Sequence, residues 1–247
     1  MNKERERAIL EILLREKSTT VSSLAKRLYA SEPSIRRDLN SLESQHFIRR
    51  KHGGAVLDET SVSEIKIPFL LREMENSDEK IRIAKKAVQL VKPGDVIFLD
   101  ASTSTFRMIP YLAEIKDITV ITNGIKALAA LSERNINCIG TGGTVVNSCL
   151  AFYGDAAYEV IRNYNADIFF FSIRGLDLDG NLSDISEKDN GIRKKMMAQS
   201  AESYLLCTSK RIDKKFMHNL CNVSELSGIV TSDALPKCIA KCCKKII

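Results

Sequence analysis

Residues 31–55, SEPSIRRDLNSLESQHFIRRKHGGA, decide how the first part of the chain folds. Placed on a helix at 100° per residue, Ile35, Leu39 and Leu42 share one face, whereas serine, arginine and asparagine side chains cover the other. This pattern predicts a helix over residues 32–45 that buries its apolar face and leaves its polar face free.

The residues on either side of this helix predict its start and the element after it. Ser31 is expected to cap the helix by accepting a backbone N–H, and Pro33 fits the first turn because no amide partner is needed there. After the helix, the basic residues 49–52 lead into Gly53-Gly54, which is typical of a strand entering a tight turn. A helix and then a basic hairpin, or wing, are therefore expected.

Two shorter helical patterns precede this stretch. Apolar residues recur at helical spacing over residues 3–16 and again over 21–28, on either side of a polar turn at 17–20. Two helices joined by a short turn, the second with a free polar face, make a helix-turn-helix, and the hairpin makes it winged. We predict a winged helix-turn-helix domain over residues 1–57.

The charge is unevenly distributed along the chain. Residues 1–57 contain 12 Lys and Arg against 7 Asp and Glu, a net charge of +5, so the other 190 of the 247 residues share +1 of the total of +6. A basic small domain beside a nearly neutral large one favours a polyanionic partner for the small domain only. We expect that partner to be a double-stranded DNA operator.

The expected DNA contacts come from the free helix face and the wing. Arginine is suited to guanine O6 and N7 in the major groove, and the wing would hold the backbone or the adjacent minor groove. For Arg37, a salt bridge to Asp38 or Glu43 is the alternative. The candidate DNA-binding residues are Ser31, Ser34, Arg36, Arg37, Asn40, Arg49, Arg50, Lys51 and His52.

Neither a membrane segment nor a metal site is expected. No apolar run approaches the ~18 residues of a membrane span, and the charged start MNKERERAIL has no signal-peptide core, which favours a cytoplasmic protein. Seven cysteines without repeated spacing favour reduced thiols. The cluster Cys238, Cys242 and Cys243 could bind a soft metal, but the other side chains near it are lysines, so we predict no metal and no cofactor.

The pattern loosens over residues 58–76, which we interpret as a linker. Its apolar residues are expected to pack partly on the second domain; they are Ile65, Ile67, Phe69 and Leu70. Ser77 can then cap a helix that reaches about residue 91, and the second domain is expected to span residues 77–247.

The second domain reads as alternating strands and helices. Strands without polar alternation indicate a parallel sheet buried on both faces, and the intervening helices are long enough for right-handed crossovers. The expected strands are residues 96–100, 119–122, 137–140, 167–172, 204–207 and 228–232. The expected helices are 103–113, 124–134, 154–164 and 189–203. The fold class is therefore α/β, Rossmann-like and doubly wound.

Ligands of such sheets bind at the carboxyl ends of the strands. Hydroxyls and backbone amides after the first strand form a good phosphate cradle, although the same residues also serve as helix caps. Glycines after the third strand would let a ligand approach the backbone closely. The alternative is that they only form tight turns. The candidate effector residues at these ends are Asp100, Ser102, Thr103, Ser104, Asn123, Gly142, Gly143 and Arg174. Further along the chain, Arg193 and Lys194 of the predicted helix 189–203 could neutralise a bound anion. Arg174 could instead pair with an aspartate of the loop 177–184, and Arg193 and Lys194 could lie on a solvated helix face.

These residues together carry a resemblance to one family. SIRRDLNSLE followed by RRKHGGA is similar to the helix-turn-helix and wing of DeoR-family transcriptional regulators. The pattern of Glu64, Arg72 and Lys80, followed by IFLDAST, ITN and GGT, resembles the sensor domain of the same family. The resemblance implies a sensor with the fold of ribose-5-phosphate isomerase and coenzyme A transferases. It also implies a repressor of a carbohydrate-metabolism operon that senses a phosphorylated sugar.

The chain departs from the family pattern in two places. Thr208-Ser209-Lys210-Arg211 stands where the family has an Asp-Ser-Ser-Lys run, so the carboxylate is missing. Asp189-Asn190 stands where a Glu-Ala pair is expected. Lys210 completes the candidate effector site as the cation of this altered segment.

A single helix-turn-helix buries little area on DNA, so we expect a homo-oligomer with two copies spaced one turn of DNA apart, about 34 Å. Two other functions are open. One is a sugar-phosphate isomerase that uses Asp177 or Glu187 with Lys210 as acid and base. The other is a DNA-binding oligomer whose large domain has no effector response. We expect a regulator rather than an enzyme.

Overall fold

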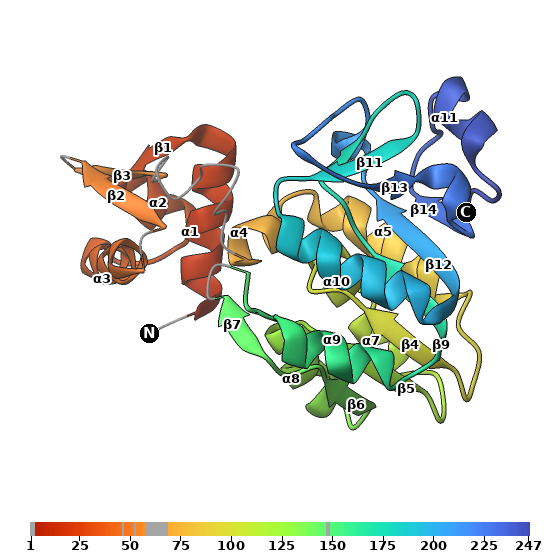
Figure 1. Cartoon of the computed structure of the whole chain (residues 1–247). Helices are drawn as coiled ribbons and strands as arrows, with labels where there is room; N and C mark the ends of the chain where they lie inside the picture. Colours follow the sequence, from red (N-terminus) through yellow and green to blue (C-terminus); the bar gives the residue numbers. More distant parts are fainter. Residues whose placement is uncertain (1–2, 46, 52, 58–68, 147–148) are drawn as a thin grey trace. The chain divides into compact units, whose positions relative to one another are not determined.

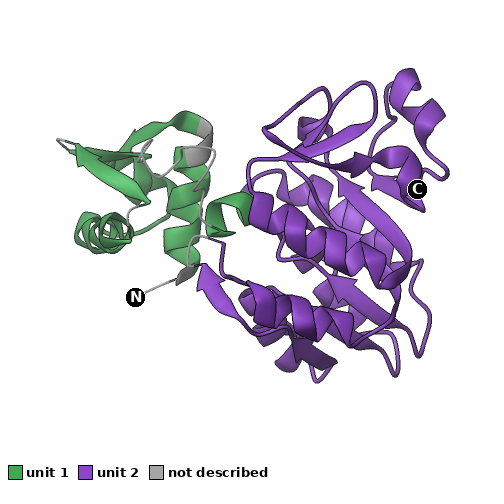
Figure 2. Ribbon diagram, viewed as in Figure 1, with its two compact units in different colours: residues 1–74 green, residues 75–247 purple. Residues whose placement is uncertain are grey.

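The computed structural model describes residues 3–45, 47–51, 53–57, 69–146 and 149–247 (Figure 1). The chain divides into two compact units, residues 1–74 and residues 75–247 (Figure 2). Each unit has its own hydrophobic core.

The first unit is a winged helix-turn-helix, as predicted. Its elements in chain order are α1 (Lys3–Glu16), β1 (Ser18–Thr20), α2 (Val21–Arg27), α3 (Glu32–Ser44), β2 (Ile48–Lys51), β3 (Gly54–Leu57) and α4 (Phe69–Met74). The strands form an antiparallel sheet in the order β1-β3-β2. The predicted apolar face of α3 is confirmed, because Ile35, Leu39 and Leu42 are buried with the apolar residues of α1 and α2.

The prediction of a polar turn at residues 17–20 is wrong, because residues 18–20 form strand β1. Its backbone pairs with β3, from Ser18 opposite Val56 to Thr20 opposite Gly54. A side chain at Gly54 would place its Cβ 2.2 Å from the Thr19 carbonyl oxygen, so this close pairing requires glycine. The pairing partner lies more than 30 residues away, which is why the local pattern did not reveal the strand.

Asp38 is an exception to the apolar packing of α3. Its side chain is only 2% exposed and forms an ion pair with Arg5 of α1, whose Nη2 donates to Asp38 Oδ1 at 3.2 Å. A buried carboxylate is tolerated only when it is paired in this way. The pair therefore fixes the contact between α1 and α3.

Tyr29 lies in the turn between α2 and α3, with φ of 49° and 98% of its surface exposed. Left-handed backbone at the end of a helix favours glycine or asparagine. We expect Tyr29→Asn to raise the free energy of unfolding of this unit by about 1 kcal/mol, because it relieves this strain. Denaturant unfolding followed by circular dichroism would measure the gain, with Tyr29→Phe as a neutral control. A loss of stability in Tyr29→Asn would show that the tyrosine ring makes stabilising contacts.

Helix α4 differs from the predicted linker. Leu71 and Met74 are buried in the core of the first unit, and Leu70 packs against the same core. The prediction that Leu70 packs on the second domain is therefore wrong, because α4 presents its apolar residues to the helix-turn-helix core. Residues 58–68, which include Glu64, Ile65 and Ile67, lie outside the described residues, so the linker remains a prediction.

The second unit is built on a six-stranded parallel sheet in the order β14-β12-β9-β4-β5-β6. The strands are β4 (Val96–Leu99), β5 (Thr119–Thr122), β6 (Asn137–Gly140), β9 (Ala166–Phe171), β12 (Ser200–Cys207) and β14 (Gly228–Thr231). All six predicted strands are confirmed, as is the doubly wound α/β class. The order reverses between β4 and β9, which places the ends of these neighbours at a switch point.

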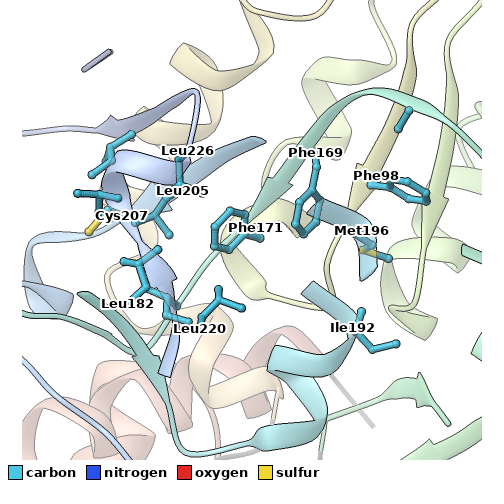
Figure 3. Close-up of a cluster of buried hydrophobic side chains, with 14 of the residues drawn as sticks. Phe98, Phe169, Phe171, Leu182, Ile192, Met196, Leu205, Cys207, Leu220 and Leu226 are labelled. Atoms are coloured by element: carbon cyan, nitrogen blue, oxygen red, sulfur yellow. The ribbon is translucent and has the colours of Figure 1, made fainter. Parts of the chain in front are cut away.

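Helices cover both faces of this sheet (Figure 1). They are α5 (Ser77–Val88), α6 (Thr103–Phe106), α7 (Ile109–Leu112), α8 (Ile125–Ser132), α9 (Asp155–Arg162), α10 (Glu187–Ala198) and α11 (Lys237–Cys242). One core holds α9, α10 and α11, and the other holds α5, α7 and α8. Side chains of β9 alternate between the two cores. Phe169 and Phe171 lie in the first core (Figure 3), and Phe170 lies in the second.

Five features of this unit differ from the prediction. The helix predicted over residues 103–113 is two short helices, α6 and α7, and Ser77 is the first residue of α5 and not its cap. The helix predicted over residues 189–203 ends at Ala198, because residues 200–203 pair with β9 and begin β12. A hairpin of β7 (Thr144–Val146) and β8 (Ala151–Tyr153) was not predicted. Nor was a small antiparallel sheet of β10 (Gly175–Leu176), β11 (Asn181–Asp184) and β13 (His218–Asn222). Strands β7, β8 and β10 have only two or three residues, and the mostly polar sequences of β11 and β13 form no apolar run, so only their pairing defines them.

Candidate functional site

The polar face of α3 is exposed, as a DNA-reading face requires. Arg36, Arg37 and Asn40 are exposed, and Ser34 is half-buried. Ser31 begins the helix with extended backbone, but the prediction that its hydroxyl accepts a backbone N–H is wrong. Its Oγ lies 2.9 Å from Ser34 Oγ instead, so the two hydroxyls bond to each other at the start of the helix.

The two arginines of α3 make only weak contacts within the protein. Arg36 Nη2 lies 3.3 Å from Glu32 Oε2, in an ion pair whose side chains are both about half exposed. Arg37 Nη2 donates to Ser34 Oγ at 3.4 Å. Asp38 pairs with Arg5 and Glu43 accepts the backbone N–H of Arg50, so the structure records other partners for both carboxylates considered for Arg37. Exposed pairs of this kind exchange readily for a phosphate or a base edge.

Arg50 fixes the wing to helix α3. Its backbone N–H donates to Glu43 Oε1 at 2.8 Å, and its Nη1 donates to Asn40 Oδ1 at 2.6 Å. Its Nε donates to the carbonyl of Gly54 in the facing strand at 3.3 Å. These contacts give helix and wing a fixed geometry before DNA is bound. Arg49 and Lys51 of the same strand are exposed, and His52 lies outside the described residues.

In the second unit, Asp100 organises the carboxyl ends of the central strands. Its Oδ1 accepts the backbone N–H of Ser102 at 3.1 Å and the hydroxyl of Thr105 at 3.2 Å. Its Oδ2 accepts the backbone N–H of Ser172 at 3.3 Å and Nε of Arg193 at 3.2 Å. One buried carboxylate thus joins the ends of β4 and β9 to helix α10.

Arg193 is the centre of a buried ionic cluster. Its Nη1 donates to Asp184 Oδ2 at 2.8 Å and to Asn190 Oδ1 at 3.1 Å, and its side chain is 8% exposed. Burial alone lowers the pKa of this guanidinium, but Asp184 and Asp100 raise it above its ordinary value. The interpretation of Arg193 as part of a solvated face is therefore wrong. Its positive charge is shared by two carboxylates of the protein.

Arg174 belongs to the same cluster. Its Nε lies 3.5 Å from Asp184 Oδ1, which confirms the alternative of an ion pair with the loop 177–184. Lys194, the next residue after Arg193, is exposed. Adjacent residues of α10 thus point in different directions, and the structure brings Arg193 and Arg174 together with Asp100 but records no contact of Lys194 with them.

Most hydroxyls of the predicted phosphate cradle have partners in the protein. Ser102 Oγ accepts the backbone N–H of Thr105 at 3.2 Å, which confirms the alternative interpretation of Ser102 as a helix cap. Ser104 Oγ donates to Ser172 Oγ at 3.4 Å, and Ser172 Oγ donates to the carbonyl of Leu206 in β12 at 2.9 Å. Thr103 is buried. These bonds connect the carboxyl ends of β4, β9 and β12.

Asn123, after β5, is 2% exposed and is held by the unpredicted hairpin. Its Nδ2 donates to the carbonyl of Phe152 at 3.3 Å, while its Oδ1 is buried without a hydrogen-bond partner among the described residues. Gly142 and Gly143 follow β6 with φ of 63° and 108°. A Cβ on Gly143 would lie 2.5 Å from the Tyr153 carbonyl oxygen of β8, so only glycine fits at this position of the turn.

Lys210, in the short 3-10 helix η1 (Ser209–Arg211), forms an ion pair with Glu75. Glu79, one turn later in α5, accepts the backbone N–H of Ser209 at 2.6 Å and the hydroxyl of Ser232 at 3.2 Å. The candidate effector residues predicted from the sequence did not include Glu75, Glu79, Thr105, Ser172 or Asp184. The acidic loop that follows Arg174 in the sequence could have indicated Asp184. No sequence signal indicates Glu75 or Glu79, because their partners lie 130 residues or more away.

Asp189 and Asn190 of α10, the second departure from the family pattern, both have partners in this chain. The Tyr153 hydroxyl of β8 donates to Asp189 Oδ1. Burial and this carboxylate raise the pKa of Tyr153, so the phenol stays protonated. Asn190 Nδ2 donates to the carbonyl of His218 at 3.0 Å, and its Oδ1 accepts from Arg193. Asp189 and Asn190 thus connect α10 to the β7–β8 hairpin and to β13.

Among the described residues, the structure has no group of three or more His, Cys, Asp or Glu side chains that could hold a metal ion. Cys238 is exposed, and Cys242 and Cys243 are half-buried with free thiols. Within the part of the chain that the structure describes, no helix is both long and apolar enough to cross a membrane.

Comparison with known proteins matches both units. The DeoR-like helix-turn-helix domain matches residues 5–61, and the DeoR C terminal sensor domain matches residues 75–233. The uncharacterized HTH-type transcriptional regulator YulB of Bacillus subtilis (strain 168) is 36% identical over 94% of this chain and 89% of its own length. The L-fucose operon activator of Haemophilus influenzae is 31% identical over 98% of this chain and 96% of its own length.

Among solved structures, ribose 5-phosphate isomerase A from Methanocaldococcus jannaschii is similar with a TM-score of 0.44 and 20% identity, over 57% of this chain and 56% of that chain. The two family models together cover most of the chain and coincide with its two structural units. The family predicted from the sequence is confirmed. The chain belongs to the DeoR family of helix-turn-helix transcriptional regulators.

Proposed function

We propose that this protein regulates a carbohydrate-metabolism operon by binding an operator with α3 and the wing, under the control of a phosphorylated sugar bound by the α/β unit. The observation that carries the proposal is the exposed polar face of α3 beside a wing that is already fixed to it through Arg50. The relative from Haemophilus influenzae, which acts on an L-fucose operon, supports a carbohydrate operon as the target.

On DNA, α3 would enter the major groove and present Arg36 and Arg37 to base edges. Both arginines exchange exposed protein contacts for DNA contacts at small cost. Arg50 donates a hydrogen bond to Asn40, so these two residues connect α3 to the wing. Arg49 and Lys51 would neutralise phosphates, which places the backbone contacts on β2.

A homo-oligomer is part of the proposal. One helix-turn-helix contacts a single half-site, and specific affinity requires two copies separated by one or more turns of DNA. The direction of regulation depends on where the operator lies relative to the promoter. The sequence predicts repression, and transcription of a reporter joined to the operator would measure the sign.

Control by the effector requires only a difference in affinity between two states. A sugar phosphate that binds one state of the protein more tightly changes DNA affinity by that difference, typically about 1–3 kcal/mol. The carboxyl ends of β4, β9 and β12 are the proposed location. Hydrogen bonds connect these ends, Asn123 and Lys210 follow β5 and β12 of the same sheet, and Arg193 of α10 donates to Asp100 after β4.

The isomerase alternative is less well supported. Asp177 accepts the backbone N–H groups of Asp179 and Asn181, at 3.1 and 2.7 Å, and closes the turn between β10 and β11. Burial raises the pKa of its carboxyl, but the hydrogen bonds from Asn181 and Asp179 together lower it below the ordinary value. A carboxylate held in this way is a poor general base, which favours a regulator over an enzyme.

Fluorescence anisotropy of the full chain on the DNA upstream of its own gene tests the proposal. We expect a specific complex that weakens steeply as salt rises and whose affinity changes with one member of a panel of sugar phosphates. Specific binding that no sugar phosphate changes would favour the oligomer without an effector response. Absence of specific binding, together with turnover of a pentose or hexose phosphate, would contradict the proposal in favour of the isomerase.

A further inference from the structure

Tyr29 occupies a position in the helix-turn-helix where a side chain is unfavourable. Helix α2 ends at Arg27 and α3 begins at Glu32, and Tyr29 lies in the turn between them. The backbone N–H of Ala30 donates to the carbonyl of Ala25 at 3.0 Å, the hydrogen bond that closes a helix whose next residue has left-handed backbone. Tyr29 is that residue, with φ of 49°. Glycine is usual there, because a Cβ in left-handed backbone costs free energy.

The Tyr29 side chain does not compensate for this strain by packing. It is 98% exposed, which is the largest exposure among the large apolar and aromatic side chains that the structure describes. A ring that stays in water contributes little through burial. A residue that is strained and does not pack against the fold points to a role in function, since such strain is concentrated at functional sites.

The turn that carries Tyr29 leads into the end of α3 that is proposed to enter the major groove. When a helix-turn-helix binds DNA, the first residues of its second helix contact base edges, while the helix before it crosses the sugar-phosphate backbone. The turn between these helices is therefore placed at the phosphates that border the groove. Tyr29 precedes Ser31 by two residues, so their Cα atoms lie at most about 7 Å apart.

The charge of the neighbouring helix end also fits a phosphate. The last turn of α2 carries Lys26 and Arg27, and both side chains are exposed. Arg27 pairs with Glu16, but both side chains of this pair are about 40% exposed, so the contact is weak. Tyr29 therefore follows two accessible cations directly in the chain.

We propose that Tyr29 is a DNA-backbone contact, whose hydroxyl donates a hydrogen bond to a phosphate oxygen at the edge of the groove that α3 enters. The inference rests on the proposed function, in which α3 and the wing bind an operator. A tyrosine hydroxyl is a suitable donor to phosphate, and a hydrogen bond to a charged acceptor is stronger than one to a neutral acceptor.

This contact would help to set the position of α3 in the groove. Arg49 and Lys51 of β2, which follows α3 in the chain, are the proposed backbone contacts of the wing. Tyr29 adds a backbone contact from the segment that precedes α3. Phosphate contacts from both segments fix the orientation of the helix between them without reading the sequence themselves.

Fluorescence anisotropy of the full chain tests the contact, on the DNA upstream of its own gene and on an unrelated duplex of equal length. We expect Tyr29→Phe to weaken binding to both duplexes by about tenfold for each copy bound, because the lost hydrogen bond is to a charged group. The salt slope should not change, since a neutral hydroxyl releases no counterion. Tyr164→Phe is the matched control: Tyr164 is a partly exposed tyrosine of the second unit, and its change should leave affinity within about twofold.

Two further variants separate this contact from other effects. Tyr29→Asn should lose affinity as Tyr29→Phe does, although it is expected to be more stable than the wild type, and a purely structural role would not produce these opposite changes. Lys51→Gln should instead reduce the salt slope by about one for each copy bound, because it removes a cation from the DNA backbone.

Unchanged affinity in Tyr29→Phe, a loss confined to the upstream DNA, or a changed salt slope in that variant would each overturn the inference. Specific binding by the wild type that depends on Arg36 and Arg37 would leave the proposed function standing in each of these cases. A wild type that binds neither duplex would refute both.

Discussion

Replacing Asp100 with alanine is expected to lower the free energy of unfolding of the second unit by about 3–5 kcal/mol, the cost of breaking a buried ion pair by removing one partner. Asp100 is 3% exposed and accepts four hydrogen bonds, three from Ser102, Thr105 and Ser172 and one from Arg193. Without the carboxylate, Arg193 remains buried with less compensation, and the ends of β4 and β9 lose their common acceptor.

Amide hydrogen exchange in the central strand β9 reports the stability of this unit separately from the first. Faster exchange at Phe169 and Phe171 in Asp100→Ala would measure the loss. Asp155→Ala is the matched control, because Asp155 is an exposed aspartate in the first turn of α9 and its removal should cost less than about 1 kcal/mol. A cost of Asp100→Ala no greater than that of the control would show that the ionic cluster does not stabilise the sheet.

The second large effect is expected on DNA. The double variant Arg36→Ala and Arg37→Ala should weaken operator binding at least about 100-fold, because each arginine that pairs with a base contributes about 1–3 kcal/mol of discrimination. Stability should change little, since both side chains are exposed and their partners within the protein are weak. Fluorescence anisotropy at two salt concentrations would measure both the affinity and the salt slope.

Arg162→Ala serves as the control for this experiment. Arg162 is an exposed arginine of α9, paired with Glu159, and lies in the other unit. Its removal changes the net charge by one but should leave operator affinity within about twofold. If the double variant keeps the operator affinity and salt slope of the wild type, α3 does not read the operator.

The parallel sheet could be predicted from the sequence because its strands are buried on both faces. Such strands appear as short continuous apolar runs, and all six were found within four residues of their observed ends. Helix α3 could also be predicted from the sequence, because its buried apolar residues recur every three to four positions. The short strands β1, β7 and β10 could not be found, because two or three residues hold no pattern and only a distant partner defines them.

The candidate site divides in the same way. The rule that ligands bind at strand ends identified Asp100 and Arg174, and Arg193 was a candidate as a basic residue of a predicted helix. The structure brings all three into one cluster. Sequence did not reveal that this cluster is buried and balanced in charge. That property depends on the contact between Asp100 and Arg193, which lie 93 residues apart, and on Asp184, which pairs with both arginines.

The sequence by itself determined the family, the two-unit organisation, the parallel sheet and the exposed basic face of the first unit, because each depends on the order of residue types within a short segment. Only the tertiary structure decided which charges meet. It placed Arg193 between two buried carboxylates, fixed the wing to α3 through Arg50, and brought Glu75 to Lys210 across 135 residues of chain. Electrostatic contacts act over a few ångströms in space whatever the separation in sequence, so only the folded chain can reveal them.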